Sequence, residues 1–488
     1  MAKHAKSVFA QDVEGLISAD LPLHLRVQGR IRATILNGSF APGSRLPSSR
    51  LLACDFKVSR HTVEWALSDL EAEGFIERKR GSGTYVATAI PLRELVPSGA
   101  LALPIESCAH EPSRRGNAIA IYATQAEPVV ARAFHPSSPA LDLFPKRIWS
   151  RLVRRALSRR DIDPWGYGAS AGLKELRRAV AEHVAVTRGI RCVAEQIIVV
   201  TSIQQAIDLA ARVLCDVGDD AWFEEPGYPI GRYLLRSAGL NVVPIPIDAD
   251  GFDPERALQT APHAKLAYVT PSHQYPTGAL MPLDRRLALL EWARTRGGWI
   301  LEDDYDGDFR YEGRSLAALQ ALDPGGRVIY IGTFTKMMFP ALRLSYMVVP
   351  EELVSIFDTM KHLADGFTTL HTQVALAEFI DGGHLAAHLR HMLREYDTRR
   401  LALIEAIAPL AGLLELGPAS AGFHVTAYLK GDQDDRAVAQ ACARRGVDLH
   451  PLSPFYVNKP RPGLLFGFAC ACPEQIARGM TIVRESLG

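Results

Sequence analysis

The stretch "GTFTKMMFPALRLSYMVVP", residues 332–350, decides the fold of this chain. It places Lys336 directly after the strand-like run "RVIYIGTF", and Arg343 follows seven residues later. A cationic side chain at the end of a buried strand is costly unless an anionic or covalent partner meets it. Ligand groups gather beyond the carboxyl ends of the strands in an open parallel sheet. The pattern therefore predicts that Lys336 lies in a ligand site at the edge of such a sheet.

The chain around this stretch alternates short apolar runs with helical patterns from about Leu141 onward. The runs are "EQIIVV", "DAWFEE", "NVVPIPI", "KLAYVTP", "GWILEDD", "RVIYIGTF" and "LSYMVV". This alternation is typical of an α/β fold, with a mainly parallel sheet and helices on both faces. Beyond about Thr372 long helical patterns precede shorter strands. We therefore expect a domain over 139–488, with a large lobe at about 139–371 and a smaller C-terminal α+β lobe at about 372–488.

Composition limits the class of protein. The chain has 488 residues, of which 48% are hydrophobic, so it is globular and long enough for two or three domains. Lys plus Arg (55) nearly equals Asp plus Glu (54), so any basic patch must be local. No signal sequence and no apolar run of membrane-spanning length is present. Cys470 and Cys472 lack the companion ligands of a zinc site. We expect a cytoplasmic protein with reduced thiols, no metal and no membrane contact.

Residues 1–90 carry a different pattern. "PLHLRVQGRIRATILNG" has helical spacing, "RLPSSRLLACDF" begins a second helix capped by Ser48 or Ser49, and "VSRHTVEWALSDLEAEG" begins a third at Ser59. "FIERKRGSGTYVA" alternates like a strand, breaks at glycines and resumes, which is typical of a hairpin. These features predict a winged helix-turn-helix. A Pro-, Ser- and Ala-rich connector should follow over 91–138.

A winged helix-turn-helix reads DNA with its third helix and reaches phosphates with its wing. A solvated helical hairpin is the alternative interpretation of the same basic residues. The expected DNA-binding residues lie at the start of the second and third helices and in the wing: Arg50, Ser59, Arg60, His61, Thr62, Arg78, Lys79, Arg80 and Gly83.

This segment also resembles the DNA-binding domain of the GntR family. The resemblance rests on "RLPSSRLLA", "VSRHTVEWAL", "LEAEGFIER" and "GSGTYV", over about 70 residues. The chain departs from the family at Asp55, Phe56 and Lys57, where a Leu-Gly pair is more common. The resemblance implies binding to double-stranded DNA, and we expect a dimer on repeated half-sites.

A second strand end adds chemistry to that of Lys336. The run "GWILEDDYDGDF" delivers Asp303, Asp304 and Tyr305 to an equivalent place in the predicted sheet. A lysine that can form a Schiff base, a carboxylate for a ring nitrogen and a phenol for a ring oxygen are what pyridoxal phosphate requires. Taken singly, the lysine also suits a surface position, and "EDD" also suits a metal-type cluster or a solvated turn. Their order along one α/β chain favours the cofactor.

Phosphate needs donors of its own. The junction "VVTSIQQAIDLA" offers backbone N–H groups at a helix start between Ser202 and Gln204. Side chains flanking the lysine add further donors, and an aromatic ring in "EEPGYP" could stack on the pyridine. These residues are Thr333, Thr335, Arg343 and Tyr228.

The C-terminal 340 residues resemble fold type I aminotransferases. The resemblance rests on "GYGASAGLKELRRAV", "EEPGYP", "TPSHQYPTG", "ILEDDYD" and "GTFTKMMFPALRLSYMV". A GntR-like winged helix joined to such a domain is the architecture of the MocR-type transcription regulators, and the whole chain is similar to them. The resemblance implies a homodimer with pyridoxal 5′-phosphate held covalently by Lys336. It further implies roles for Asp303 at the pyridine nitrogen, Tyr305 at the ring hydroxyl, Tyr228 as stacking partner, Thr333, Thr335, Arg343, Ser202 and Gln204 at the phosphate, Tyr167 at the partner's phosphate, and His273 and Gln274 at the ring edge.

The chain departs from this family at the substrate end. Relatives commonly carry Gly-Phe-Ala-Arg, whose arginine clamps an α-carboxylate, whereas this chain reads "GFACACPE" with Cys470. Ser202 stands where glycine is usual, and Ile230 where some relatives carry another arginine. The expected effector is therefore an amine without a demanding α-carboxylate, or the cofactor itself, although Arg232 or Arg314 could restore a clamp. An active aminotransferase with a DNA-binding appendage, or a regulator that uses this domain only to dimerise, remain alternatives.

Overall fold

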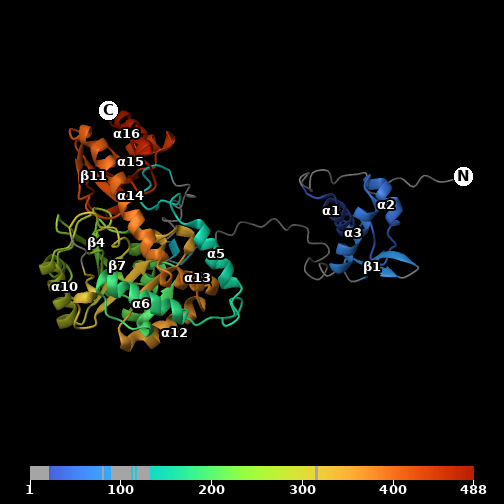
Figure 1. The fold of residues 1–488 in the computed structure, drawn as a ribbon, viewed down its shortest axis with the longest axis horizontal. Helices are drawn as coiled ribbons and strands as arrows, with labels where there is room; N and C mark the ends of the chain where they lie inside the picture. Colours follow the sequence, from blue (N-terminus) through green and yellow to red (C-terminus); the bar gives the residue numbers. More distant parts are fainter. Residues whose placement is uncertain (1–20, 80–81, 89–111, 114–115, 118–131, 314–316) are drawn as a thin grey trace. The chain divides into compact units, whose positions relative to one another are not determined.

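The computed structural model describes residues 21–79, 82–88, 112–113, 116–117, 132–313 and 317–488. The chain divides into two compact units, Met1–Glu111 and Pro112–Gly488 (Figure 1). The predicted Arg80, most of the predicted connector and Arg314 lie outside the described residues.

The N-terminal unit has the predicted three helices and hairpin. Its elements are α1 (Leu23–Leu36), α2 (Ser49–Phe56), α3 (Arg60–Ala72), β1 (Ile76–Lys79) and β2 (Gly83–Val86). The Ser48 hydroxyl accepts a hydrogen bond from the Leu51 N–H, and the Ser59 hydroxyl accepts one from the Thr62 N–H, so these serines cap α2 and α3. Apolar side chains of the three helices and both strands, such as Ile31 and Leu67, form one buried core. The helices and the hairpin predicted for this unit are therefore confirmed.

The C-terminal unit is built on a seven-stranded sheet in the order β3-β9-β8-β7-β6-β4-β5. Its strands are β3 (Ile197–Val200), β4 (Asp220–Glu225), β5 (Asn241–Pro246), β6 (Leu266–Val269), β7 (Trp299–Asp304), β8 (Val328–Thr333) and β9 (Ser345–Val348). Strand β9 is antiparallel to both of its neighbours, and the other pairs are parallel. All seven strands coincide with predicted apolar runs, so the mainly parallel sheet is confirmed.

Helices cover both faces of this sheet. Alternate residues of β3 show the two faces, because Ile197 and Val199 pack in one apolar cluster while Ile198 and Val200 pack in another. The helices of the large lobe are α5 (Lys146–Leu157), α6 (Lys174–Arg188), α7 (Ile203–Leu214), α8 (Pro229–Ser237), α9 (Pro254–Thr260), α10 (Leu283–Arg296), α11 (Phe334–Met337), α12 (Val354–Asp365) and α13 (Leu370–Asp381). No helix within the described residues is long and apolar enough to cross a membrane.

The smaller lobe packs helices on a four-stranded antiparallel sheet in the order β10-β11-β13-β12. In Figure 1 its later elements, drawn in orange and red, lie together beside the large lobe. Its elements are α14 (His384–Ile407), β10 (Leu414–Leu416), β11 (His424–Leu429), α15 (Asp435–Arg444), β12 (His450–Pro451), β13 (Gly463–Gly467) and α16 (Pro473–Leu487).

The segment 132–138 belongs to this lobe, whereas the sequence predicts a connector over 91–138. Phe134 is fully buried and forms a β-bridge with Gly467. Its carbonyl accepts a hydrogen bond of 2.8 Å from the Gly467 N–H. The expected connector therefore ends before Arg132, because an isolated buried phenylalanine gives no periodic signal in the sequence.

Candidate functional site

The side chain of Lys336 lines a cavity of about 760 Å³ between the two lobes of the C-terminal unit. The lysine lies in α11, a short helix that follows β8. The Thr333 hydroxyl caps this helix by accepting a hydrogen bond of 3.1 Å from the Thr335 N–H. The Lys336 ammonium group donates a hydrogen bond of 2.8 Å to the carbonyl of Ser137. The strand end and its cap thus fix the lysine at the cavity, as the sequence predicts.

Burial changes the acid-base behaviour of Lys336. The pKa of its ammonium group falls from 10.5 to about 8, chiefly because burial penalises the charged form. The carboxylates of Asp306 and Asp303 oppose this shift. A much larger fraction of the amine is therefore neutral near pH 7 than for a lysine in water.

Asp303 lies at the end of β7 and lines the same cavity. Burial raises the pKa of its carboxyl group to about 7, while the hydrogen bond from Tyr268 opposes the rise. The Tyr268 phenol, on neighbouring β6, donates to Oδ2 of Asp303. Oδ1 is also buried and has no hydrogen-bond partner within the described residues. One oxygen of this carboxylate is thus available to a donor on a ligand.

The neighbouring acids of β7 serve other purposes. Asp304 forms an ion pair of 2.6 Å with Arg188 and accepts a hydrogen bond of 2.6 Å from the Tyr330 hydroxyl. Glu302 accepts hydrogen bonds from two backbone N–H groups, at 2.7 and 2.9 Å. Because side chains alternate along a strand, Asp303 is the one of the three that lines the cavity. The metal-type interpretation of "EDD" therefore does not hold.

Tyr305 and Tyr228 both line the cavity, and Tyr228 immediately precedes α8. The Tyr305 hydroxyl lies 2.9 Å from Nδ1 of His273, which in turn lies 2.8 Å from the Asp306 carboxylate. His273 therefore reaches the cavity through Tyr305. The Gln274 amide donates to the Glu224 carboxylate at 3.1 Å and so lies in the buried wall behind the cavity.

The residues predicted for the phosphate do not all gather in one chain. The Ser202 hydroxyl caps α7 by accepting from the Gln205 N–H, and the next residue, Ile203, lines the cavity. The Thr333 hydroxyl is engaged by the helix cap and by Ser345. None of the five residues predicted for the phosphate is among the described residues that line the cavity: Ser202, Gln204, Thr333, Thr335 and Arg343.

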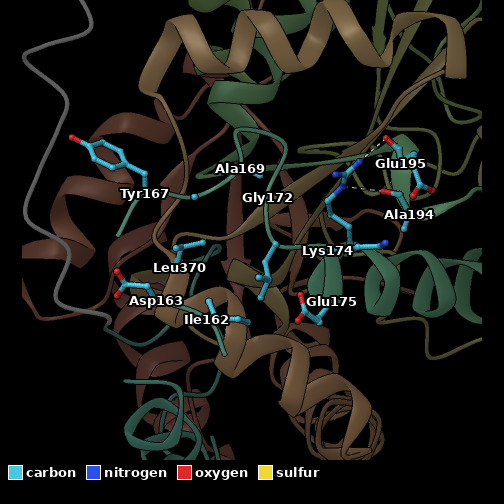
Figure 2. Close-up of a pocket in the computed structure, with 13 residues that line it drawn as sticks. Ile162, Asp163, Tyr167, Ala169, Gly172, Lys174, Glu175, Ala194, Glu195 and Leu370 are labelled. Atoms are coloured by element: carbon cyan, nitrogen blue, oxygen red, sulfur yellow. Dashed lines mark hydrogen bonds between the residues drawn. The ribbon is translucent and has the colours of Figure 1, made fainter. Parts of the chain in front are cut away.

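Tyr167 is 96% exposed and lines a different hollow of about 420 Å³. Figure 2 shows its ring extending away from the other labelled residues of that hollow. Its ring centroid lies 5.9 Å from that of Phe367, and no contact links it to Lys336 of the same chain. Tyr167 and Lys336 therefore line different hollows of the chain.

The thiol of Cys470 contacts two backbone carbonyl groups, and it offers no positive charge of the kind that an arginine would offer to a ligand carboxylate. Its thiol donates to the carbonyl of Arg132 at 3.3 Å and lies 3.7 Å from that of His135. Arg232, which could have replaced the arginine, is buried and donates to the carbonyl of Phe455 at 3.4 Å. Arg436 is an exposed cation of the cavity rim.

In the N-terminal unit, the predicted DNA contacts divide into two groups. Arg50 and His61 are exposed, as is Arg60, whose guanidinium donates to the Ser49 hydroxyl at 3.2 Å. Thr62 is half-buried at the helix start beside the cap.

The wing forms the second group. Arg78 lies 3.2 Å from both Glu64 and Glu71, so its guanidinium ties the wing to α3. Lys79 lies over the ring of Tyr85, and Gly83 has a φ of +120°, which a side chain would strain.

Sequence reasoning missed several residues. Tyr268 and Thr270 read as buried strand residues, and Ser137 fell in the predicted connector. Asp448 and His450 line the cavity from the small lobe, where no motif marked them. In the N-terminal unit the guanidinium of Arg45 lies against Gly83, where a side chain at residue 83 would clash with it. Residues far apart in sequence converge at these places, so only the fold reveals them.

Comparison with known proteins agrees with this organisation. Residues 150–478 match the family model of aminotransferase class I and II, and residues 23–86 match that of the gntR family of bacterial regulatory proteins. The probable rhizopine catabolism regulatory protein MocR of Rhizobium meliloti is 37% identical over 472 residues, covering 96% of this chain and 94% of the relative.

Two further matches are a second regulator and a solved aminotransferase structure. The HTH-type pyridoxine biosynthesis transcriptional regulator PdxR of Corynebacterium glutamicum is 31% identical, and the match covers 92% of this chain and 95% of that regulator. An archaeal alanine:glyoxylate aminotransferase shares the fold, with a TM-score of 0.69 at 24% identity over 77% of this chain and 96% of its own. The chain therefore belongs to the MocR-type transcription regulators, in which a GntR helix-turn-helix domain is joined to an aminotransferase class I/II domain.

Proposed function

We propose that this regulator binds pyridoxal 5′-phosphate through Lys336 and controls transcription in response to an amine or to the cofactor itself. The observation that carries the proposal is the pair formed by the Lys336 amine and the unpartnered Oδ1 of Asp303 in one cavity. A buried acceptor without a donor costs free energy, and the protonated ring nitrogen of the cofactor supplies that donor. Lys336 and Asp303 therefore fit the aldehyde and the ring nitrogen of this group.

Each cavity residue then has a defined task. Lys336 binds the cofactor covalently, and its lowered pKa keeps part of the amine neutral for that purpose. Asp303 would accept a hydrogen bond from the protonated ring nitrogen, and Tyr268 orients the carboxylate from behind. Tyr305 and Tyr228 offer a hydroxyl and an aromatic face at the cavity wall. When bound, the cofactor supplies an aldehyde carbon that exchanges amines.

The effector class follows from position 470. Cys470 donates to backbone carbonyls, so it provides no cation for an α-carboxylate. We therefore infer an amine without a demanding α-carboxylate as effector. The cofactor itself is the second candidate, because the PdxR relative is named for pyridoxine biosynthesis.

The remaining parts of the proposal concern assembly. The exposed Tyr167 supports a homodimer in which each chain lends this phenol to the partner's phosphate. A dimer of winged helices would bind repeated half-sites on double-stranded DNA through Arg50, Arg60 and His61. We place this regulator in the cytoplasm with its DNA.

A spectrum of the purified chain tests the cofactor assignment. We expect visible absorbance from the lysine-bound cofactor, and borohydride followed by peptide mapping should locate the label on Lys336. Lys336→Ala should abolish the absorbance while the protein still binds DNA. Label found on another lysine, or absorbance that survives the substitution, contradicts the assignment.

An active aminotransferase remains the second candidate, because Lys336 and Asp303 are both retained. A panel of amino donors with a keto acid as acceptor, assayed for product formation, distinguishes the two. Sensing without catalysis predicts spectral change without turnover, since the group that would position a carboxylate is missing at Cys470.

A further inference from the structure

Three side chains with metal-binding atoms meet in the wall of the Lys336 cavity. His135, Asp448 and His450 each offer one ligand atom, and these atoms lie within 4.8 Å of one another. Asp448 and His450 line the cavity directly. None of the three belongs to the residues proposed to hold the cofactor. The cluster therefore needs an explanation of its own.

Backbone contacts hold the cluster together. The Asp448 N–H donates a hydrogen bond of 3.0 Å to the carbonyl of Ala133, which fixes the His135 segment against the start of β12. The Cys470 thiol donates to the carbonyl of Arg132 in the same segment. The residue that replaces the family's arginine thus supports the segment that brings His135 to the cavity.

The side chains are also oriented. Nδ1 of His135 lies 3.1 Å from the Ser138 hydroxyl, while Nε2 lies 3.9 Å from Oδ2 of Asp448. The ring centroids of His135 and His450 are 5.0 Å apart. The Ser138 hydroxyl contacts one ring nitrogen of His135, so the other ring nitrogen is directed at the Asp448 carboxylate. A polar group on the second ring nitrogen is the usual arrangement around a metal-binding histidine.

We propose that His135, Asp448 and His450 bind a divalent transition-metal ion such as Zn²⁺. Two imidazoles and one carboxylate are common ligands of such ions, and a three-ligand site keeps a coordination position open. Ligand atoms at about 2.0–2.2 Å from an ion lie at most about 4.4 Å apart, so the side chains close by a few tenths of an ångström or more. Because two ligands line the cavity, the open position faces it.

The metal would also explain how the cavity recognises a ligand without the family's arginine. An ion beside Lys336 offers a Lewis acid for an oxygen or nitrogen donor of the effector. This consequence rests on the proposed function, but metal binding itself does not.

Metal titration of the untagged, chelator-treated full-length chain tests the proposal. We expect one Zn²⁺ per chain, and Co²⁺ in its place should give visible d–d absorbance typical of a low-coordinate site. Asp448→Asn and His450→Ala should each weaken binding at least about tenfold. His263→Ala, at an exposed histidine before β6, is the matched control and should leave binding unchanged.

Lys336→Ala separates this proposal from the cofactor assignment, because it removes covalent cofactor binding but none of the three ligands. Metal binding that persists in Lys336→Ala and is lost in His450→Ala supports the site. The proposal is overturned if the folded wild-type chain binds no metal at micromolar concentration. It is equally overturned if the double variant, with Asp448→Asn and His450→Ala in one chain, binds the metal with the affinity of the wild type.

Discussion

The neutral fraction of Lys336 near pH 7 can be measured directly. Its pKa lies at about 8 in place of 10.5, because burial penalises the ammonium form. A group with a pKa of about 8 is neutral in about one tenth of molecules at pH 7, and one at 10.5 in about one in three thousand. The amine of Lys336 should therefore react roughly 300-fold faster at pH 7 than a free lysine of the same intrinsic nucleophilicity.

Competitive labelling gives this number. Cofactor-free protein and a lysine analogue share one tube with a limiting amine-specific acylating reagent, and peptide mass spectrometry reads the label on Lys336 between pH 6 and 11. The midpoint should fall near pH 8. A midpoint at or above pH 10 would refute the reasoning, since it would mean that the ammonium group is solvated.

Two carboxylate variants test the cause of the shift. The Asp303 carboxylate raises the pKa of Lys336, so Asp303→Asn should move the labelling midpoint to lower pH. Asp304→Asn is the matched control on the same strand, where the carboxylate contacts Arg188 and Tyr330. An equal shift in both variants would show that the effect is not local.

Two further predictions concern the other parts of the molecule. Arg60→Ala should weaken specific DNA binding by about 1–3 kcal/mol if this side chain reads a base. Arg78→Ala should instead destabilise the N-terminal unit by about 1 kcal/mol or less, because it loses half-exposed ion pairs with Glu64 and Glu71. Electrophoretic mobility shift assays measure the loss of DNA binding, and thermal unfolding measures the loss of stability. Loss of stability in Arg60→Ala with loss of DNA binding alone in Arg78→Ala would contradict the geometry. Tyr167→Ala should weaken cofactor binding, and mixed dimers of Tyr167→Ala with Lys336→Ala should regain one intact site per dimer. Mixed dimers with no intact site would contradict a phenol lent across subunits.

Strong local patterns allowed much of the fold to be predicted. The seven strands of the large lobe were visible as apolar runs, and Ser59 marked the start of α3 because a cap is a local event. The order of the strands was not predictable, since β3 pairs with β9 across about 150 residues. Pairing of that range depends on tertiary packing, which periodicity does not encode.

The site divides in the same way. Lys336 and Asp303 end strands and could be found from local sequence. Tyr268 was missed because a tyrosine within a strand looks like any buried aromatic residue, although its hydroxyl orients Asp303. His135 and Asp448 were missed because their proximity depends on a hydrogen bond between the Asp448 N–H and the Ala133 carbonyl, which are far apart in sequence. Individual strand ends can be recognised in a sequence, but convergence of distant segments cannot.

The alternation along β7 limits how relatives of this chain can vary in length. Asp303 faces the cavity, whereas Glu302 and Asp304 meet backbone N–H groups and Arg188 on the other side. Deleting or inserting a single codon between α10 and β7 would exchange these roles and turn the unpartnered oxygen away from Lys336. We therefore expect homologous genes to tolerate many amino-acid replacements before β7, while gaps in their alignments fall on the far side of α10.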